Sequence, residues 1–291
     1  MTTPFVLSTS GSGRATAYIE SNKVISYQGK THVAWLDTPN EGFRVKMRTL
    51  DQASGEWSDE VTIGEAVDNH GGPALTIDHE GYLHIVYFSH HHPFRYHRSV
   101  RPNDASEWGP VEKFGTDLTY PTLICAKDGT LILSARRSHD DEPWELEVWK
   151  KPSGAEWARH STILKSDRNG YSQYATSMVW GHDHKSLYLG FRMYQHPDTS
   201  NMVSYTAVGF MKSADEGETW TKYEGNPVIG NSDIKDFRDP KITWDEDRHK
   251  WIMSLAAGDK IMFYDSKNLK NWNLLSEFKK DKNSKDGVWE C

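Results

Sequence analysis

Histidine, tyrosine and arginine side chains recur in this sequence in a pattern that suits proton transfer beside a bound anion. His70 and His90 lie 20 residues apart, and Tyr120 and Arg136 lie 16 residues apart. A tyrosine beside a cation can have a lowered pKa and act as general base or acid. An arginine and a histidine could neutralise the carboxylate of a uronic-acid sugar and so acidify its C5 proton. Tyrosine or histidine could then remove that proton and protonate the leaving oxygen at C4, in a β-elimination that needs no cofactor.

Two plainer interpretations compete with this one. Arg136, Arg137 and Arg192 each follow an apolar segment and form a local cationic group in a chain of net charge −7. They could bind a carboxylate or sulfate through paired hydrogen bonds, or they could brace loops through carboxylates such as Asp140. Each tyrosine, taken alone, could equally stack on a sugar or pack in the interior.

Three consecutive histidines at positions 90–92 raise the question of a metal site. Neighbouring residues of a strand point to opposite faces, so at most two of the three could face one ion. We therefore expect one of them to act in catalysis and the others to pack around it. We expect no bound metal and no cofactor.

A repeat positions these side chains. A polar turn followed by tryptophan recurs at intervals of 51, 49, 63 and 52 residues, at Trp57, Trp108, Trp157, Trp220 and Trp272. Within each repeat two apolar strands flank a tight turn, a third strand follows, and a fourth comes after the tryptophan. Four antiparallel strands repeated in this way are typical of a β-propeller blade. We predict an all-β fold, a five-bladed propeller with four-stranded antiparallel blades, with a sixth partial blade as the alternative.

The blade pattern predicts where a site would form. The residue before the innermost strand and the residue that ends the second strand reach the same mouth of a propeller. His70 and Tyr120 stand at such strand starts, and His90 and Arg136 at such strand ends. We expect a further set of residues at this mouth to bind substrate, namely Arg137, Tyr174, Arg192, Tyr194 and Asp239.

Composition excludes several classes of protein. The 12 Trp, 13 Tyr and 10 Phe residues argue against a disordered chain. No apolar run is long enough to span a membrane, and the acidic balance argues against nucleic acid as a partner. The start of the chain lacks a signal-peptide pattern. Cys125 and Cys291 make neither a disulfide framework nor a zinc pattern, and we expect a monomer.

Residues 20 to about 205 resemble the BNR-repeat family that includes the propeller ulvan lyases of polysaccharide lyase families 24 and 25. The segments HVAWLD, DNHGGPALTIDHEGYLHIVYFSHHHPFRYHRS and TYPTLICAKDGTLILSARRS carry this resemblance. It implies an acidic polysaccharide substrate. His70 and Arg136 would neutralise its carboxylate, and Tyr120 would be the acid or base. The implied catalytic set is His70, His90, Tyr120, Arg136 and Tyr171, with Tyr174 as the alternative in the last place.

The remainder, from about residue 213, resembles glycoside hydrolase family 32, the five-bladed propellers that cleave fructans. The segments DFRDPKITWDEDRHKWIMSLAAG and GVWEC carry it. The resemblance implies that Asp239 is a transition-state stabiliser and that Glu290 is the general acid/base. That family also needs an N-terminal aspartate nucleophile in a motif like WMNDPNG. The nearest string, WLDTPNEG, ends a strand of the other pattern, and we interpret its Asp37 as a coincidence. Without a nucleophile the retaining mechanism cannot run.

Two family patterns in one chain favour a chimera that joins blades of two propellers near residues 205–226. We favour an engineered chimera over a natural recombinant or a divergent family member. Such a joining is structurally feasible because blades are modular and each contacts mainly its neighbours. The expected single propeller domain over 1–291 has a closing strand at 1–20, lyase-like blades 1–4 from 21 to about 205, and a family-32-like blade 5 with a closing strand from about 213 to 291. The parents of these segments are expected to be secreted or periplasmic.

Three functions stay open at this point. The first is a polysaccharide lyase that cleaves an acidic, uronate-containing polymer such as ulvan by β-elimination. The second is a chimeric propeller scaffold with little or no catalysis. The third is a fructan hydrolase without a recognisable nucleophile.

Overall fold

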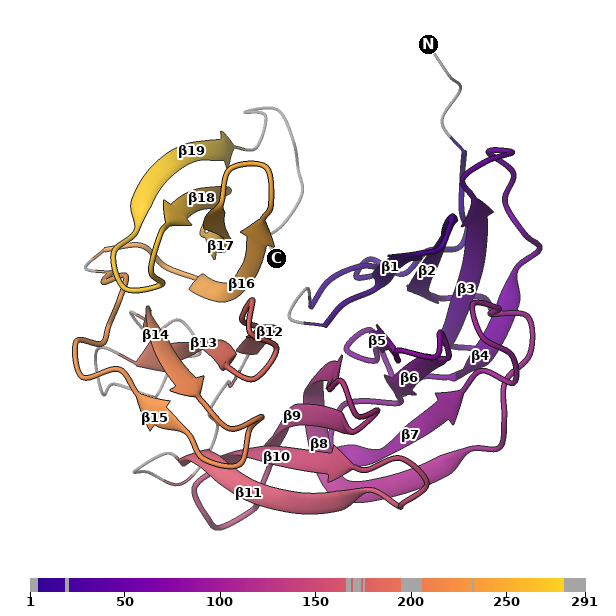
Figure 1. Cartoon of the computed structure of the whole chain (residues 1–291), viewed down its shortest axis with the longest axis horizontal. Coiled ribbons are helices and arrows are strands. Elements are labelled where there is room, and N and C mark those ends of the chain that lie inside the picture. Colours follow the sequence, from indigo (N-terminus) through magenta and orange to yellow (C-terminus); the bar gives the residue numbers. More distant parts are fainter. Residues whose placement is uncertain are drawn as a thin grey trace. The chain divides into compact units, whose positions relative to one another are not determined.

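A computed structural model describes residues 5–18, 21–165, 169, 174, 176–194, 206–231 and 233–279, apart from the side chains of residues 193 and 194. The regular secondary structure of these residues is entirely strand (Figure 1). Two compact units can be distinguished, residues 1–17 with 21–171 and residues 18–20 with 172–291. No helix that could cross a membrane occurs in the part of the chain that the structure describes.

The first unit contains three four-stranded antiparallel blades. Blade 1 consists of β1 (Val24–Tyr27), β2 (Lys30–Asp37), β3 (Arg44–Asp51) and β4 (Val61–Glu65). Blade 2 consists of β5 (Ala74–Ile77), β6 (Leu83–Tyr87), β7 (His92–Arg98) and the first part of β8 (Glu112–Cys125). Blade 3 consists of the second part of β8, β9 (Leu131–Arg137), β10 (Glu145–Lys151) and β11 (Ala158–Lys165). Because β8 pairs with β7 up to Leu118 and with β9 from Leu118 onward, blades 2 and 3 form one seven-stranded sheet.

The second unit contains two further blades of the same strand order. Blade 4 consists of β12 (Thr176–Trp180), β13 (Leu187–Tyr194), β14 (Thr206–Ser213) and the short β15 (Thr221–Lys222). Blade 5 consists of β16 (Phe237–Asp245), β17 (Lys250–Ala257), β18 (Lys260–Ser266) and β19 (Asn273–Lys279). In both blades consecutive strands pair antiparallel, as they do in the first unit.

The predicted four-stranded repeat is confirmed in every blade. Each repeated tryptophan precedes the outermost strand of its blade, as Trp57 precedes β4 and Trp272 precedes β19. The number of blades fits the predicted five. The single domain with its two closing strands stays a prediction, since residues 280–291 lie outside the described residues.

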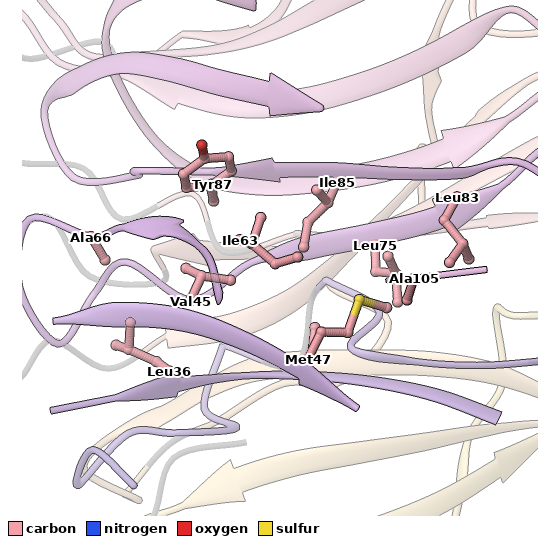
Figure 2. Packing of buried hydrophobic residues seen from close by; sticks show 11 residues of the cluster. Leu36, Val45, Met47, Ile63, Ala66, Leu75, Leu83, Ile85, Tyr87 and Ala105 are labelled. Atoms are coloured by element: carbon pink, nitrogen blue, oxygen red, sulfur yellow. The ribbon is translucent and has the colours of Figure 1, made fainter. Parts of the chain in front are cut away.

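Strands that are buried on both faces build the core. Every residue of β6 is buried, and alternate residues of a strand point to opposite faces. Leu83, Ile85 and Tyr87 pack against blade 1, as Figure 2 shows, whereas Val86 belongs to the cluster that joins blades 2 and 3. A third cluster joins blades 4 and 5 within the second unit. Apolar contact between neighbouring blades therefore holds the strand ends that carry polar side chains.

Candidate active site

A cluster of polar side chains forms in the first unit where several strands begin or end. His70 precedes β5, His90 and His91 follow β6, Tyr120 lies within β8 and Arg136 lies near the end of β9. The rings of His70 and His90 stack with their centroids 4.1 Å apart, and those of His90 and His91 are 4.7 Å apart. Four of the five residues that the sequence analysis assigns to catalysis thus lie in one contiguous cluster of the described structure.

Asp68 joins the two stacked histidines. Its Oδ1 accepts hydrogen bonds from the His70 backbone N–H at 2.7 Å and from His70 Nδ1 at 3.0 Å. Its Oδ2 lies 2.6 Å from His90 Nδ1. Burial opposes ionisation of Asp68, but the hydrogen bonds from His70 and His90 outweigh it, so the pKa of this carboxyl lies below its ordinary value. An ionised carboxylate only accepts hydrogen bonds, so both rings donate from Nδ1.

Arg14 contacts the opposite edge of His70. Its Nη1 lies 2.8 Å from His70 Nε2. A guanidinium has donors only, so His70 Nε2 must accept and the ring must be neutral with its proton on Nδ1. Burial, and after it the charge of His90, lowers the pKa of His70, in agreement with this state.

Aromatic rings and an imidazole surround the Arg136 guanidinium. The side chain is 1% exposed. Its Cζ lies 4.6 Å from the centroid of the Tyr120 ring and 4.7 Å from that of Trp144, distances at which a cation is attracted to a ring. Its Nη2 donates to His91 Nε2 at 3.3 Å. Burial first, and the charge of Arg136 second, lowers the pKa of His91 to about 4, so His91 is neutral at pH 7.

The backbone around this cluster adopts conformations that side chains rarely allow. Phe88, His90, His91, Asp117 and Tyr120 all have positive φ. Between Thr119 and Thr122 the pairing of β8 with β9 shifts, so that two residues of β8 lie opposite one of β9. Bulges and backbone strain of this kind concentrate at functional sites, where they redirect a side chain.

Asp68, His70 and His90 also satisfy the spacing of a metal-binding group, because one ligand atom from each lies within 4.8 Å of the others. Two histidines and a carboxylate are donors that zinc accepts. In this structure, however, the carboxylate binds both Nδ1 atoms by hydrogen bonds, and Arg14 stands at the far edge of His70. The arrangement fits a hydrogen-bonded imidazole pair better than a cation site.

Of the other predicted site residues, one lies in the first unit, three lie in the second unit, and the remainder lie outside the described structure. Arg137, on the opposite face of β9 from Arg136, forms an ion pair with the fully buried Glu147 at 3.3 Å. Tyr174, Arg192 and Asp239 are buried in the second unit. Tyr171, Glu290 and the side chain of Tyr194 lie outside the described residues.

Asp239 follows the charged residues Asp236 and Arg238. The Arg238 guanidinium lies 3.7 Å from Asp239 Oδ2 and 3.5 Å from Asp236 Oδ1. Asp37, the residue nearest to a nucleophile motif in the sequence, is 2% exposed. Trp35 Nε1 donates to its Oδ1 at 2.7 Å and Ser8 Oγ to its Oδ2 at 2.9 Å.

Sequence reasoning missed four members of the cluster, namely Arg14, Asp68, His91 as the partner of Arg136, and Trp144. Asp68 carried a local signal, since aspartate two residues before a histidine commonly caps the turn with its side chain. Arg14 carried none, because it lies 56 residues from its partner.

Comparison with known proteins supports both resemblances. Residues 137–291 match the sequence profile of the glycosyl hydrolases family 32 N-terminal domain. Levanase of Bacillus subtilis (strain 168) is 62% identical over 79 residues, which are 27% of this chain and 12% of the levanase. Levanase of Bacillus sp. (strain L7) is 30% identical over 156 residues, which are 50% of this chain and 17% of that protein. The matched region spans less than a fifth of the length of these relatives.

Among solved structures, a polysaccharide lyase of family PL25, an ulvan lyase bound to -[GlcA(1-4)Rha3S]-, superposes with a TM-score of 0.68. The match covers 91% of this chain and 72% of that chain at 18% sequence identity, which shows a shared propeller fold. The family 32 profile begins at Arg137, so the two likenesses overlap between residue 137 and about residue 205. Because this profile matches more than half of the chain, at residues 137–291, this β-propeller belongs to glycosyl hydrolase family 32.

Proposed function

We propose that the cluster in the first unit is the active site of a polysaccharide lyase that cleaves an acidic, uronate-containing polymer by β-elimination. The observation that carries the proposal is the buried Arg136 guanidinium, held between Tyr120 and Trp144 and linked through His91 and His90 to His70. A buried cation beside titratable groups suits a substrate that is itself an anion.

The reaction would use these groups in separate roles. The positive charge of Arg136 would stabilise the negative charge that develops on the uronate carboxylate when C5 loses its proton. Tyr120, whose ring lies against Arg136, or His90 would take that proton. The electron pair would form the C4–C5 double bond as the C4–O bond breaks, and the leaving oxygen would take up a proton.

Asp68 supports His90 in the alternative in which His90 is the base. It accepts the Nδ1 proton of His90, which leaves Nε2 as the nitrogen that can take up a proton. An aspartate that orients a histidine in this way also stabilises the imidazolium that forms during the reaction.

A fructan hydrolase is the second candidate, favoured by family 32 membership and by the buried Asp239. Retaining hydrolysis requires a carboxylate nucleophile. The one aspartate that matches such a motif, Asp37, already accepts hydrogen bonds at both oxygens from Trp35 and Ser8. This engagement favours the lyase over the hydrolase. A chimeric scaffold without catalysis is the third candidate.

The test measures two products from the same protein preparation. Ulvan is the first polymer to use, because the ulvan lyase that shares this fold is bound to a glucuronate-containing repeat. We expect ultraviolet absorbance of unsaturated uronate to rise with ulvan, and no release of reducing ends from levan.

Tyr120→Phe should lower the ulvan rate by about 10²-fold or more. The matched control is Tyr82→Phe, which changes a tyrosine stacked on Arg98 in the β5–β6 turn and should keep the rate. Release of reducing ends from levan alone would favour the hydrolase. A folded protein that is inactive on both polymers would favour the scaffold.

A further inference from the structure

We infer that Arg14 is a further substrate-binding residue of this site, and that it supplies, beside His70, the positive charge that meets the carboxylate of an acidic sugar. This inference rests on the proposed function and changes the role of one residue in it. The family resemblance assigns neutralisation of the carboxylate to His70 and Arg136. The geometry points to the arginine on the far edge of that ring.

Arg14 reaches the histidines on an N-terminal strap, which we define as residues 8–15. The strap hydrogen-bonds to the end of β2, where Ser12 N donates to Leu36 O at 2.9 Å and Leu36 N donates to Ala15 O at 3.0 Å. Thr38 N donates to Ser10 O at 2.8 Å. Backbone hydrogen bonds on both sides of Arg14 therefore fix the position of its Cα relative to blade 1.

Asp37 anchors the strap through its side chain. Its Oδ2 accepts from Ser8 Oγ at 2.9 Å and from Ser10 Oγ at 3.4 Å, while Trp35 Nε1 holds its other oxygen. Two serines of the strap thus donate hydrogen bonds to one buried carboxylate, which holds the strap on blade 1. The anchor places a side chain of the chain's start against a residue of blade 2.

The charge state of the histidine row shows why the arginines matter. Three imidazoles, His70, His90 and His91, lie in sequence, with Arg14 bonded to the first and Arg136 to the last. Each arginine forces the ring nitrogen that it contacts to be an acceptor, so both terminal rings are neutral. Asp68, His90 and Arg14 are three of the groups that face His70. Of these, only the guanidinium keeps a positive charge at every pH at which a polysaccharide would be cleaved.

The His70 ring also separates Arg14 from Asp68. Asp68 binds Nδ1 on one edge of the ring, and Arg14 binds Nε2 on the other. The neutral imidazole positions the guanidinium, and the half-buried side chain of Arg14 keeps partial access to solvent. Arg136 is 1% exposed, so Arg14 is the more accessible of these two arginines.

The test compares Arg14→Ala and Arg14→Lys with the unchanged protein. We expect Arg14→Ala to raise KM for ulvan about tenfold, with kcat retained within a few-fold, as the loss of one charge-assisted hydrogen bond predicts. Lysine should recover part of the loss, because it keeps the charge but not the planar pair of donors. Titration of polyglucuronate by calorimetry should show the same order of affinities.

Arg48→Ala is the matched control. Arg48 also contacts the segment before the strap, since its Nε donates to Leu7 O at 3.1 Å. Its Nη1, however, donates to Ser58 O, between β3 and β4. It should leave KM unchanged. Nitrogen-15 NMR of the imidazoles adds a readout that needs no substrate. His70 should be the neutral Nδ1–H tautomer in the unchanged protein, and in Arg14→Ala it should take up a second proton, on Nε2, at a higher pH, because the charge of Arg14 lowers its pKa.

The outcomes separate this inference from the proposed function. Cleavage of ulvan with an unchanged KM in Arg14→Ala would overturn the inference and leave the lyase proposal intact. Absence of cleavage together with weaker polyglucuronate binding in Arg14→Ala would support Arg14 and overturn the lyase. If the unchanged protein binds no polyglucuronate, both fail. A His70 that carries its proton on Nε2 would overturn the positioning of Arg14.

Discussion

The part of β8 that enters blade 3 and the start of β16 in blade 5 have the same backbone conformation but carry different side chains. In β8 the sequence Tyr120-Pro121 lies opposite the single residue Ala135, and in β16 Asp239-Pro240 lies opposite Leu255. Tyr120 and Asp239 have φ of 56° and 58°. Three residues earlier, Asp117 and Asp236 have φ of 53° and 54°. The same two-for-one bulge therefore presents a tyrosine in one blade and a carboxylate in the other.

The partner strands differ as well. Thr119 pairs with Arg136 on β9, whereas Arg238 pairs with Ala256 on β17. In blade 3 the cation, Arg136, therefore lies on the neighbouring strand. In blade 5 the cation, Arg238, lies on the same strand as Asp239 and next to it in sequence. Since alanine occupies the position equivalent to Arg136, the blade itself does not need an arginine there. The bulge is a property of the architecture, and the side chains on it set the chemistry.

Replacement of Arg136 by alanine gives β9 the residue that β17 has at the equivalent position, Ala256. We expect this change to have the largest effect on activity. We expect kcat/KM for ulvan to fall by about 10²- to 10³-fold, as the loss of one preorganised donor to a developing anion typically does. The far-ultraviolet circular dichroism spectrum should stay unchanged, because blade 5 folds with alanine at this position. Arg101→Ala, at an exposed turn, is the control and should retain activity. Equal activities of the two variants would remove Arg136 from the site.

Asp68→Asn tests the second contrast, between a carboxylate that orients histidines and one that stands beside an arginine. An amide could not accept from both Nδ1 atoms while its own N–H₂ group faces one of them. We expect kcat for ulvan to fall by about 10-fold or more, through loss of the ring orientation. Stopped-flow or steady-state absorbance would measure it, with Asp59→Asn, an exposed residue before β4, as control. Full activity would mean that the histidine pair needs no carboxylate.

Sequence alone predicted the blades well because their signals are local. The turn between each inner pair of strands, and the tryptophan before each outer strand, lie within a few residues of the structure that they specify. The blade pattern also predicts that Tyr120, at the start of an inner strand, and Arg136, at the end of the second strand, lie at the same mouth. This is why four of the proposed catalytic residues could be placed together.

The contacts that complete the cluster could not be predicted for a different physical reason. His90 and His91 have φ of 112° and 56°, so the alternation from which the direction of the three histidines was argued does not hold there. Both lie beyond the end of β6, in the turn that leads into β7. Arg14 depends on a strap that binds β2 through backbone atoms, which carry no sequence signature.

The two prolines offer a smaller test of the shared bulge. Pro121 and Pro240 each follow the residue of positive φ. A proline that suits its native conformation stabilises a protein by about 0.4–1 kcal/mol, mostly by restricting the unfolded chain. Pro121→Ala and Pro240→Ala should therefore each lower the free energy of unfolding by this amount, measured by urea denaturation. A loss in one blade alone would show that the two bulges are not equivalent.

The last expected effect concerns His91, whose Nε2 accepts a hydrogen bond from Arg136. Because the pKa of His91 in the folded protein is about 4, the unfolded chain, whose histidines titrate near 6.5, binds more protons between these values. The contribution of His91 to stability is therefore complete above pH 6.5 and is lost as the pH falls toward 4.

His91→Gln keeps an acceptor for Arg136 and removes the titration. We expect its urea midpoint to fall less between pH 7 and pH 4.5 than that of the unchanged protein. His79→Gln, in the exposed β5–β6 turn, should behave as the unchanged protein does. If His91→Gln also follows the unchanged protein, the loss of stability in acid arises elsewhere and the low pKa of His91 does not contribute to it.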